Sequence, residues 1–138
     1  MTIIIDSNIL FSALISNNSI IRKIILFSQE KFISSEIIML EYKKYREELI
    51  KKSKLTEDEF QELFIILTKN IYLVNNEKLK DYIKEAKELC QDIDIKDTEF
   101  VACALAYSNS ILWTEDKALK KITKIKVLNT KEILELLS

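Results

Sequence analysis

Four acidic residues lie beside apolar segments of the sequence, a setting in which carboxylates can be held for chemistry. They are Asp6, Glu41, Asp97 and Asp116. Asp6 directly follows Ile3-Ile4-Ile5, and Asp116 comes shortly after the apolar residues 111–113. Four carboxylates gathered in one place would repel one another unless a cation lay among them. Mg²⁺ and Mn²⁺ prefer hard oxygen ligands, so the four acids together predict a site for a divalent cation.

Each acid also has an ordinary structural explanation. An aspartate that follows a strand, such as Asp6 or Asp116, is commonly the N-cap of the next helix. Asp97 falls in the first turn of a predicted helix, where a negative charge complements the helix dipole. Glu41 would be a solvated helix residue. Taken one at a time, the acids leave both interpretations open.

The composition excludes most other kinds of active site. The 138-residue chain contains no histidine, no glycine and no proline. Without histidine there can be no Ser-His-Asp or Cys-His catalysis and no histidine-ligated zinc. Without glycine, neither the GxGxxG dinucleotide loop nor the GxxxxGK phosphate loop can form. The two cysteines, Cys90 and Cys103, lack the CxxC spacing of a zinc site and are expected to be small core residues. Chemistry is left to carboxylates, lysines, hydroxyls or a bound metal.

The charge balance requires local features if the partner is a nucleic acid. The formal net charge is −1, whereas proteins that hold nucleic acid by bulk electrostatics are usually far more basic. Basic residues gather in and after one predicted helix: Lys43, Lys44, Arg46, Lys51, Lys52 and Lys54. They would follow a nucleic acid backbone or form an ordinary solvated helix face, and the solvated face is favoured. Tyr42 and Trp113 would stack bases or pack in the core, and core packing is favoured.

Strands alternate with helices along the whole chain. Short apolar, largely β-branched runs predict strands at residues 2–5, 31–34, 71–74, 111–113 and 125–128. Helical spacing predicts helices at residues 8–15, 20–29, 36–52, 56–67, 77–89, 94–107, 116–122 and 130–137, with a glycine-free turn at Asn17-Asn18-Ser19. Thr56 and Glu59 match a capping box.

This alternation predicts an α/β fold with one domain over residues 1–138. A central parallel sheet of about four to five strands would be flanked by helices. Ligands of open α/β sheets gather beyond the carboxyl ends of the strands, where such a fold would bring the four acids together.

The sequence resembles the PIN-domain ribonucleases, in particular small prokaryotic forms such as the VapC-type toxins. The similar segments run in the family's order from residue 3 to residue 119. They are Ile3-Ile4-Ile5-Asp6-Ser7-Asn8, then Ile33-Ser34-Ser35 leading to Glu41, then Asp94-Ile95-Lys96-Asp97 with residues 100–105, and finally Leu112-Trp113-Thr114-Glu115-Asp116-Lys117-Ala118-Leu119.

The resemblance implies a metal-dependent ribonuclease that hydrolyses RNA phosphodiester bonds with one or two Mg²⁺ or Mn²⁺ ions. Its catalytic and metal-binding acids would be Asp6, Glu41, Asp97 and Asp116, with Asp6 and Asp97 as the first direct ligands. Asn8 and Thr114 would be polar supports, and Asp94 is interpreted as a helix cap first and an outer acid second. A metal lowers the pKa of bound water, so such a site needs no histidine.

Two segments depart from the family pattern. The family often has glycine between the helix carrying Asp97 and the next strand, where this chain has Ser108-Asn109-Ser110. It also often has glycine at the position of Glu115. The acids are intact, so these changes concern loop geometry more than chemistry.

The resemblance also implies partners. If the protein is a toxin, an antitoxin should block the acidic groove, and a homodimer would use apolar residues of the first two helices. No segment reads as a secretory signal or is long enough to span a bilayer, so a cytoplasmic location without membrane contact is expected.

Two other classes of function compete with the nuclease. The first is a non-catalytic PIN-like module that binds RNA or protein, since a fold does not fix a function. The second, a phosphatase or receiver-like domain, is weaker, because Asp6-Ser7-Asn8 offers neither an adjacent acidic pair nor a DxD motif at the first strand.

Overall fold

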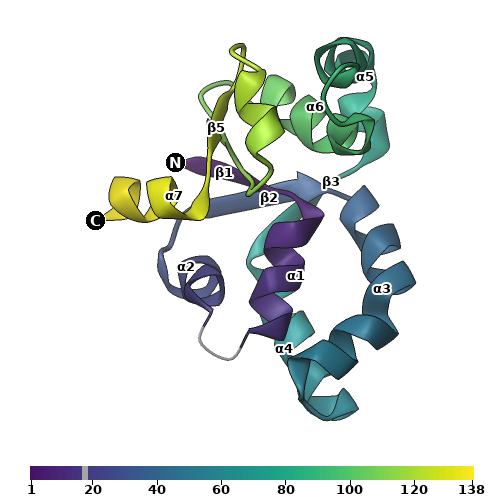
Figure 1. The fold of residues 1–138 in the computed structure, drawn as a ribbon, viewed down its shortest axis with the longest axis vertical. Coiled ribbons are helices and arrows are strands. Elements are labelled where there is room, and N and C mark those ends of the chain that lie inside the picture. Colours follow the sequence, from purple (N-terminus) through teal and green to yellow (C-terminus); the bar gives the residue numbers. More distant parts are fainter. Residues whose placement is uncertain (17–18) are drawn as a thin grey trace.

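A computed structural model describes residues 1–16 and 19–138, and its centre is a five-stranded parallel sheet (Figure 1). The strand order is β3-β2-β1-β4-β5. The strands are β1 (Thr2–Ile5), β2 (Lys31–Ser35), β3 (Ile71–Val74), β4 (Ile111–Trp113) and β5 (Lys126–Leu128). All neighbouring pairs are parallel. The predicted α/β class and strand number are confirmed, with boundaries shifted by a residue at β2 and β5.

Helices cover both faces of this sheet. They are α1 (Ser7–Ile15), α2 (Ile20–Phe27), α3 (Ile37–Ser53), α4 (Glu57–Lys69), α5 (Asn76–Cys90), α6 (Thr98–Ala106) and α7 (Thr130–Leu137), with short 3-10 turns η1 (Ile95–Asp97) and η2 (Lys117–Lys121). In Figure 1, α5 and α6 lie on one side of the strands and α1, α3 and α4 on the other. The central strand β1 is therefore apolar on both faces, and Ile3, Ile4 and Ile5 are completely buried.

The order of the strands reverses next to β1. The chain runs from β1 outward through β2 to β3, and then returns to place β4 on the other side of β1. Ile5 pairs with Trp113 at the carboxyl ends of β1 and β4. The loops that leave these two strands consequently diverge to opposite sides, and ligands bind in the crevice that such a reversal opens.

Local capping explains several helix boundaries. The Thr56–Glu59 capping box is confirmed: the Glu59 side chain accepts the Thr56 N–H at 2.9 Å, and the Thr56 hydroxyl accepts the Glu59 N–H at 3.2 Å. Asn17 and Asn18 of the predicted turn lie outside the described residues, and Ser19 is the N-cap of α2. Asn109 has a positive φ of 64°, so asparagine takes the left-handed conformation in the loop before β4.

One predicted helix is wrong in its extent. The helix expected over residues 94–107 is divided into η1 and α6. Asp94 Oδ1 accepts the Lys96 N–H at 3.0 Å, and the Thr98 hydroxyl donates to the Ile95 carbonyl at 2.6 Å. These two bonds close a separate 3-10 turn. Asp97 is therefore the last residue of η1 and occupies the N-cap position of α6, and it is not a first-turn residue of one continuous helix.

The expected core residues are buried. Cys90 and Cys103 are both free and buried, and burial raises their pKa to about 11 and about 12, so neither is a reactive thiolate at neutral pH. Tyr42 stacks on Phe64 with ring centroids 3.8 Å apart, and Trp113 is fully buried. Neither ring is available to stack on a base.

Among the described residues, no single helix is long and apolar enough to cross a membrane. The pair α1 and α2, bent by 106° relative to each other, meets that length and composition only when the two are taken together.

Candidate metal centre

A cavity of about 510 Å³ opens at the carboxyl ends of β1 and β4. All four predicted acids line it, together with two of the predicted supporting residues: Asp6, Glu41, Asp97, Asp116, Asn8 and Asp94. They arrive from separate parts of the fold. Asp6 and Asn8 belong to the β1–α1 junction, Glu41 to α3, Asp94 and Asp97 to η1, and Asp116 to the loop after β4.

Asp6 is held rigidly at the bottom of this cavity. It is only 4% exposed. One carboxylate oxygen, Oδ1, accepts the Ile9 N–H at 3.0 Å and so caps α1. The other, Oδ2, accepts the Thr114 hydroxyl at 2.6 Å. The pKa of Asp6 is raised to about 6, and burial is the largest cause. The two hydrogen bonds lower this pKa, and the charges of Asp116 and Glu41 add to the increase.

Thr114 connects the two sides of the strand reversal. Its hydroxyl donates to Asp6 and accepts the Asp116 N–H at 3.0 Å. Asp116 Oδ1 in turn accepts the Ala118 N–H at 3.0 Å, which caps η2. Thr114 is 2% exposed, so its hydroxyl fixes the loop after β4 to the loop after β1 from beneath the cavity.

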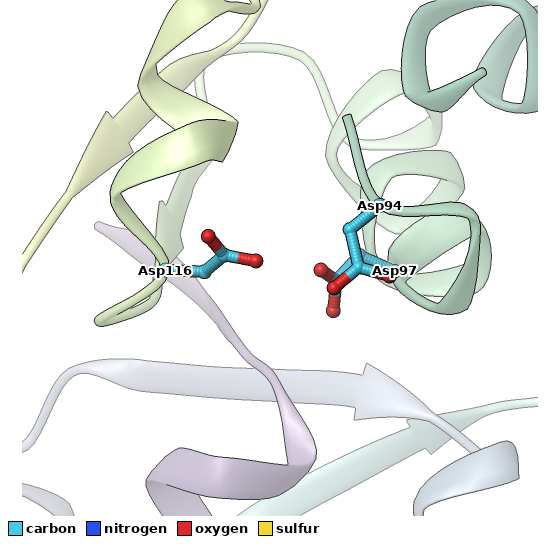
Figure 2. Close-up of side chains that lie close together, drawn as sticks. All are labelled: Asp94, Asp97 and Asp116. Atoms are coloured by element: carbon cyan, nitrogen blue, oxygen red, sulfur yellow. The ribbon is translucent and has the colours of Figure 1, made fainter. Parts of the chain in front are cut away.

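Asp94, Asp97 and Asp116 form a group of three that approach one another closely (Figure 2). Each offers one carboxylate oxygen, and these three oxygens lie within 4.8 Å of one another. Figure 2 shows Asp116 facing Asp94 and Asp97 across the gap between η1 and the loop after β4. Burial first, and then the charges of Asp6, Asp94 and Asp116, raise the pKa of Asp97 to about 8. Three acids at this separation need a proton or a cation among them.

The acids differ in how far hydrogen bonds already use them. Asp6, Asp94 and Asp116 each cap a helix or 3-10 turn, so the structural explanation from the sequence holds for these three. Asp97 stands at an N-cap position without making a capping bond. Its carboxylate therefore needs another explanation, and the facing acids provide one.

Glu41 and Asn8 lie on the walls of the cavity. Glu41 is half-buried on α3 and close enough to raise the pKa of Asp6 through its charge, but it is outside the group of three. Asn8 is exposed in the first turn of α1. The structure thus brings all the predicted site residues to one place, with Asp94 rather than Asp6 in the group of three that also contains Asp97 and Asp116.

The donor set fits a hard divalent cation. Every ionisable group in this group of three is a carboxylate, and no sulfur or imidazole ligand lies among them. Among the described residues, no lysine or arginine forms an ion pair with any of the five site acids; every ion pair that the structure shows there uses another carboxylate. Mg²⁺ and Mn²⁺ take such oxygen donors, and their charge would compensate the cluster.

Comparison with known families identifies the fold. A family model described as the PIN domain matches residues 4–138. The chain belongs to the PIN-domain family. A chain in the crystal structure of VapBC2 from Rickettsia felis bound to a DNA fragment from their promoter is similar in fold, with a TM-score of 0.68 and 20% sequence identity. The match covers 94% of this chain and 98% of that one. No curated protein sequence matches at a significant level.

In this PIN domain, Glu115 has a role that the sequence analysis missed. Its Oε2 accepts both the backbone N–H of Thr130 at 2.9 Å and the Thr130 hydroxyl at 3.2 Å. The same hydroxyl accepts the indole N–H of Trp113 at 3.0 Å. The residue between Thr114 and Asp116 thus fastens the site loop to the start of α7. No local sequence pattern predicts a contact between residues 15 positions apart.

Proposed function

We propose that this PIN domain is a metal-dependent ribonuclease that hydrolyses RNA phosphodiester bonds at the acidic cavity. The observation that carries the proposal is the convergence of five carboxylates from four segments of the chain, with no lysine or arginine paired to them among the described residues. A bound cation would relieve the repulsion within this cluster, which lies where the strand order reverses and where ligands of α/β sheets bind.

Asp94, Asp97 and Asp116 would hold the ion, because their oxygens already face one another within 4.8 Å. Bound Mg²⁺ or Mn²⁺ would supply a Lewis acid that activates water and balances the charge of the phosphate. Asp6 and Glu41 complete the negative wall of the cavity and would orient the ligands of the ion or hold a second one. Thr114 keeps Asp6 and Asp116 in register through its two hydrogen bonds.

The wider role proposed is that of a toxin in a toxin–antitoxin pair. The support is the likeness in fold to a chain in the crystal structure of VapBC2 from Rickettsia felis bound to a DNA fragment from their promoter. An inhibitory partner of this chain would cover the acidic cavity. The alternative, a PIN-like module that binds RNA or protein without cutting, predicts the same fold but does not explain why five acids converge.

Cleavage of RNA by purified variants tests the proposal. A pool of random-sequence, end-labelled single-stranded RNA is incubated with Mg²⁺, Mn²⁺ or a chelator. We expect cleavage with metal only, reduced at least about 100-fold in Asp116→Asn and in Asp6→Asn, because each carries a carboxylate that the site needs. Asp81→Asn, an exposed acid on α5 outside the cavity, should cleave like the parent protein.

Two results would contradict the proposal. One is a folded parent protein that leaves RNA intact with both metals. The other is Asp116→Asn cutting as fast as the parent at equal melting temperature. A small phosphate ester, assayed beside the RNA, separates nuclease from phosphatase activity.

A further inference from the structure

The acidic cavity extends beyond the carboxylates into a groove between α1 and α3. Its walls there are Phe11 and Ile15 from α1 and Tyr45 and Leu49 from α3, with Lys52 one turn further along α3. The same cavity therefore has an acidic end and a largely apolar end, where Glu48 and Lys52 of α3 also line the wall and form an ion pair with each other. The five site acids account for only the acidic end.

The two helices place these residues in matched layers. Phe11 comes five residues after Asp6, and Tyr45 comes four residues after Glu41. At a rise of about 1.5 Å per residue, both aromatic rings are carried about 6–8 Å away from the acids along their helices. A pair of acids is thus followed, one helical turn on, by a pair of aromatic residues. This step is comparable to the distance that separates a phosphate from the base of its own nucleotide.

Phe11 and Tyr45 contact each other but remain open to the cavity. Their ring centroids are 6.1 Å apart with an interplanar angle of 69°, an edge-to-face pair. Tyr45 is 38% exposed. Tyr42, three residues earlier on the same helix, is by contrast buried in a stack with Phe64. The fold thus buries one tyrosine of α3 and leaves the next one presented to the groove.

Positive charge lies beside this aromatic pair. The Lys44 ammonium is 5.3 Å from the centre of the Tyr45 ring, and Lys52 lines the far end of the groove, where it pairs with Glu48 at 3.4 Å. A cation site at one end, a planar apolar surface next to it and the Lys44 ammonium beside that surface match the sequence of groups along a nucleotide chain: phosphate, base, phosphate.

We propose that Phe11 and Tyr45 form a subsite for one unpaired nucleobase of the RNA, adjacent to the phosphate held at the acids. The inference rests on the proposed ribonuclease function and adds a specificity-determining surface to it. Stacking accepts any base, so the subsite selects single-stranded over paired RNA, because a base must leave its helix to reach the rings.

The test combines one protein change with one RNA change. The cleavage site on a single defined oligoribonucleotide is mapped first, and each flanking base is then removed in turn to leave an abasic position. Tyr45→Leu should raise KM on the intact RNA about tenfold, the loss of one stacked base, with kcat within about twofold of the parent. Removal of one flanking base should raise KM of the parent similarly and leave KM of Tyr45→Leu unchanged.

A matched control is Tyr72→Leu, which removes a more exposed tyrosine (56%) from the edge strand β3, outside the groove. It should leave KM unchanged. Equal KM values for Tyr45→Leu, Tyr72→Leu and the parent would overturn the subsite, as would independent effects of the ring and of the missing base. Melting temperatures of both variants verify that they fold.

Failure of the subsite and failure of the nuclease function give different results. Binding of the same oligonucleotide by fluorescence anisotropy in Ca²⁺ needs no cleavage. If the parent cuts RNA but its KM is independent of Tyr45, the subsite is overturned and the nuclease stands. If it never cuts but its binding weakens in Tyr45→Leu and not in Tyr72→Leu, the reverse holds. If Tyr45→Leu abolishes binding of a protein partner in the groove while RNA binding is unchanged, the subsite is also overturned.

Discussion

The PIN domain has two cavities of nearly equal size at opposite ends of its sheet. The acidic one, about 510 Å³, lies at the carboxyl ends of the strands. The other, about 530 Å³, lies at the amino ends of β4 and β5 and is lined by the end of α6 and two loops: Ala104, Leu105, Ser108, Asn109, Ser110, Lys124, Ile125 and Lys126. The two cavities do not differ in volume. They differ in how far the charged side chains that line them are paired.

In the second cavity, the structure already pairs a charge. Lys124 forms an ion pair with Glu85 of α5. The acidic cavity also contains one such pair, between Lys52 and Glu48 of α3. Its other five carboxylates converge from four segments, and within the part of the chain that the structure describes none of these five is paired with a lysine or arginine. Unbalanced charge therefore indicates a binding site better than cavity volume does. Stability measurements on variants of each cavity test this difference.

The largest expected effect is stabilisation by metal. A ligand that binds only the folded state at 1,000 times its Kd adds about 4 kcal/mol, roughly 15 °C in melting temperature for a domain of this size. We expect Mn²⁺ to raise the melting temperature of the parent in this way. Asp97→Asn should lose the response and, without metal, melt higher than the parent, because it removes repulsion among the acids.

Lys126→Gln, in the second cavity, is the control for the metal experiment and should respond to Mn²⁺ like the parent. An unchanged melting transition of the parent at millimolar Mn²⁺ would show that the acidic cavity is not a metal site.

A smaller effect is the pH dependence of the metal-free protein. The folded pKa of Asp6, about 6, lies above its ordinary value of 3.8, so the folded state holds this proton more tightly than the unfolded one. Stability is therefore lost as pH rises from about 4 to about 6, on the order of 3 kcal/mol for this buried group. Asp97, raised to about 8, extends the loss toward pH 8.

Metal-free unfolding by urea at pH 5 and pH 8 measures this loss. The parent should be less stable at pH 8, and Asp97→Asn should show a smaller difference between the two pH values. A parent that is more stable at pH 8 would contradict the clustered geometry of the acids.

The smallest effect concerns Glu115. Removing its two hydrogen bonds to Thr130 in Glu115→Ala should lower stability by about 1 kcal/mol, since the contact is exposed. It should also weaken Mn²⁺ binding several-fold by freeing the loop that carries Asp116. Calorimetric titration with Mn²⁺ measures the second effect. Glu135→Ala, an exposed acid on α7, should leave Kd unchanged; equal Kd values for both variants would mean that Glu115 only anchors α7.

Much of the fold was predictable because its signals are local. The run Ile3-Ile4-Ile5 predicts a strand buried on both faces, and the Thr56–Glu59 box marks a helix start that the structure shows. The division of the helix over residues 94–107 was missed, since it depends on two side-chain hydrogen bonds, one that Asp94 accepts and one that Thr98 donates to the Ile95 carbonyl, and these compete with a regular helical turn.

The candidate site was predictable in its residues and not in its arrangement. Asp6, Glu41, Asp97 and Asp116 stand out by type and by their apolar neighbours, but nothing in the sequence orders them by proximity. Asp94 was ranked behind them as a cap. The structure makes it both a cap and a member of the group of three, because one carboxylate oxygen accepts the Lys96 N–H while the side chain still lies close to Asp97 and Asp116.

The sequence alone determined the chemistry that remains open to this protein. Without histidine and glycine, only carboxylates, lysines, hydroxyls and a metal are left, and the order of the acids resembles a PIN domain. Tertiary structure decided which groups meet. The strand reversal beside β1 brings Asp6 and Asp116 together through Thr114, and η1 turns Asp97 toward them without a cap. The physical reason is that the local propensities of the residues determine the helices and strands. Acids that are distant in the sequence come close together only when the strands pair into the sheet.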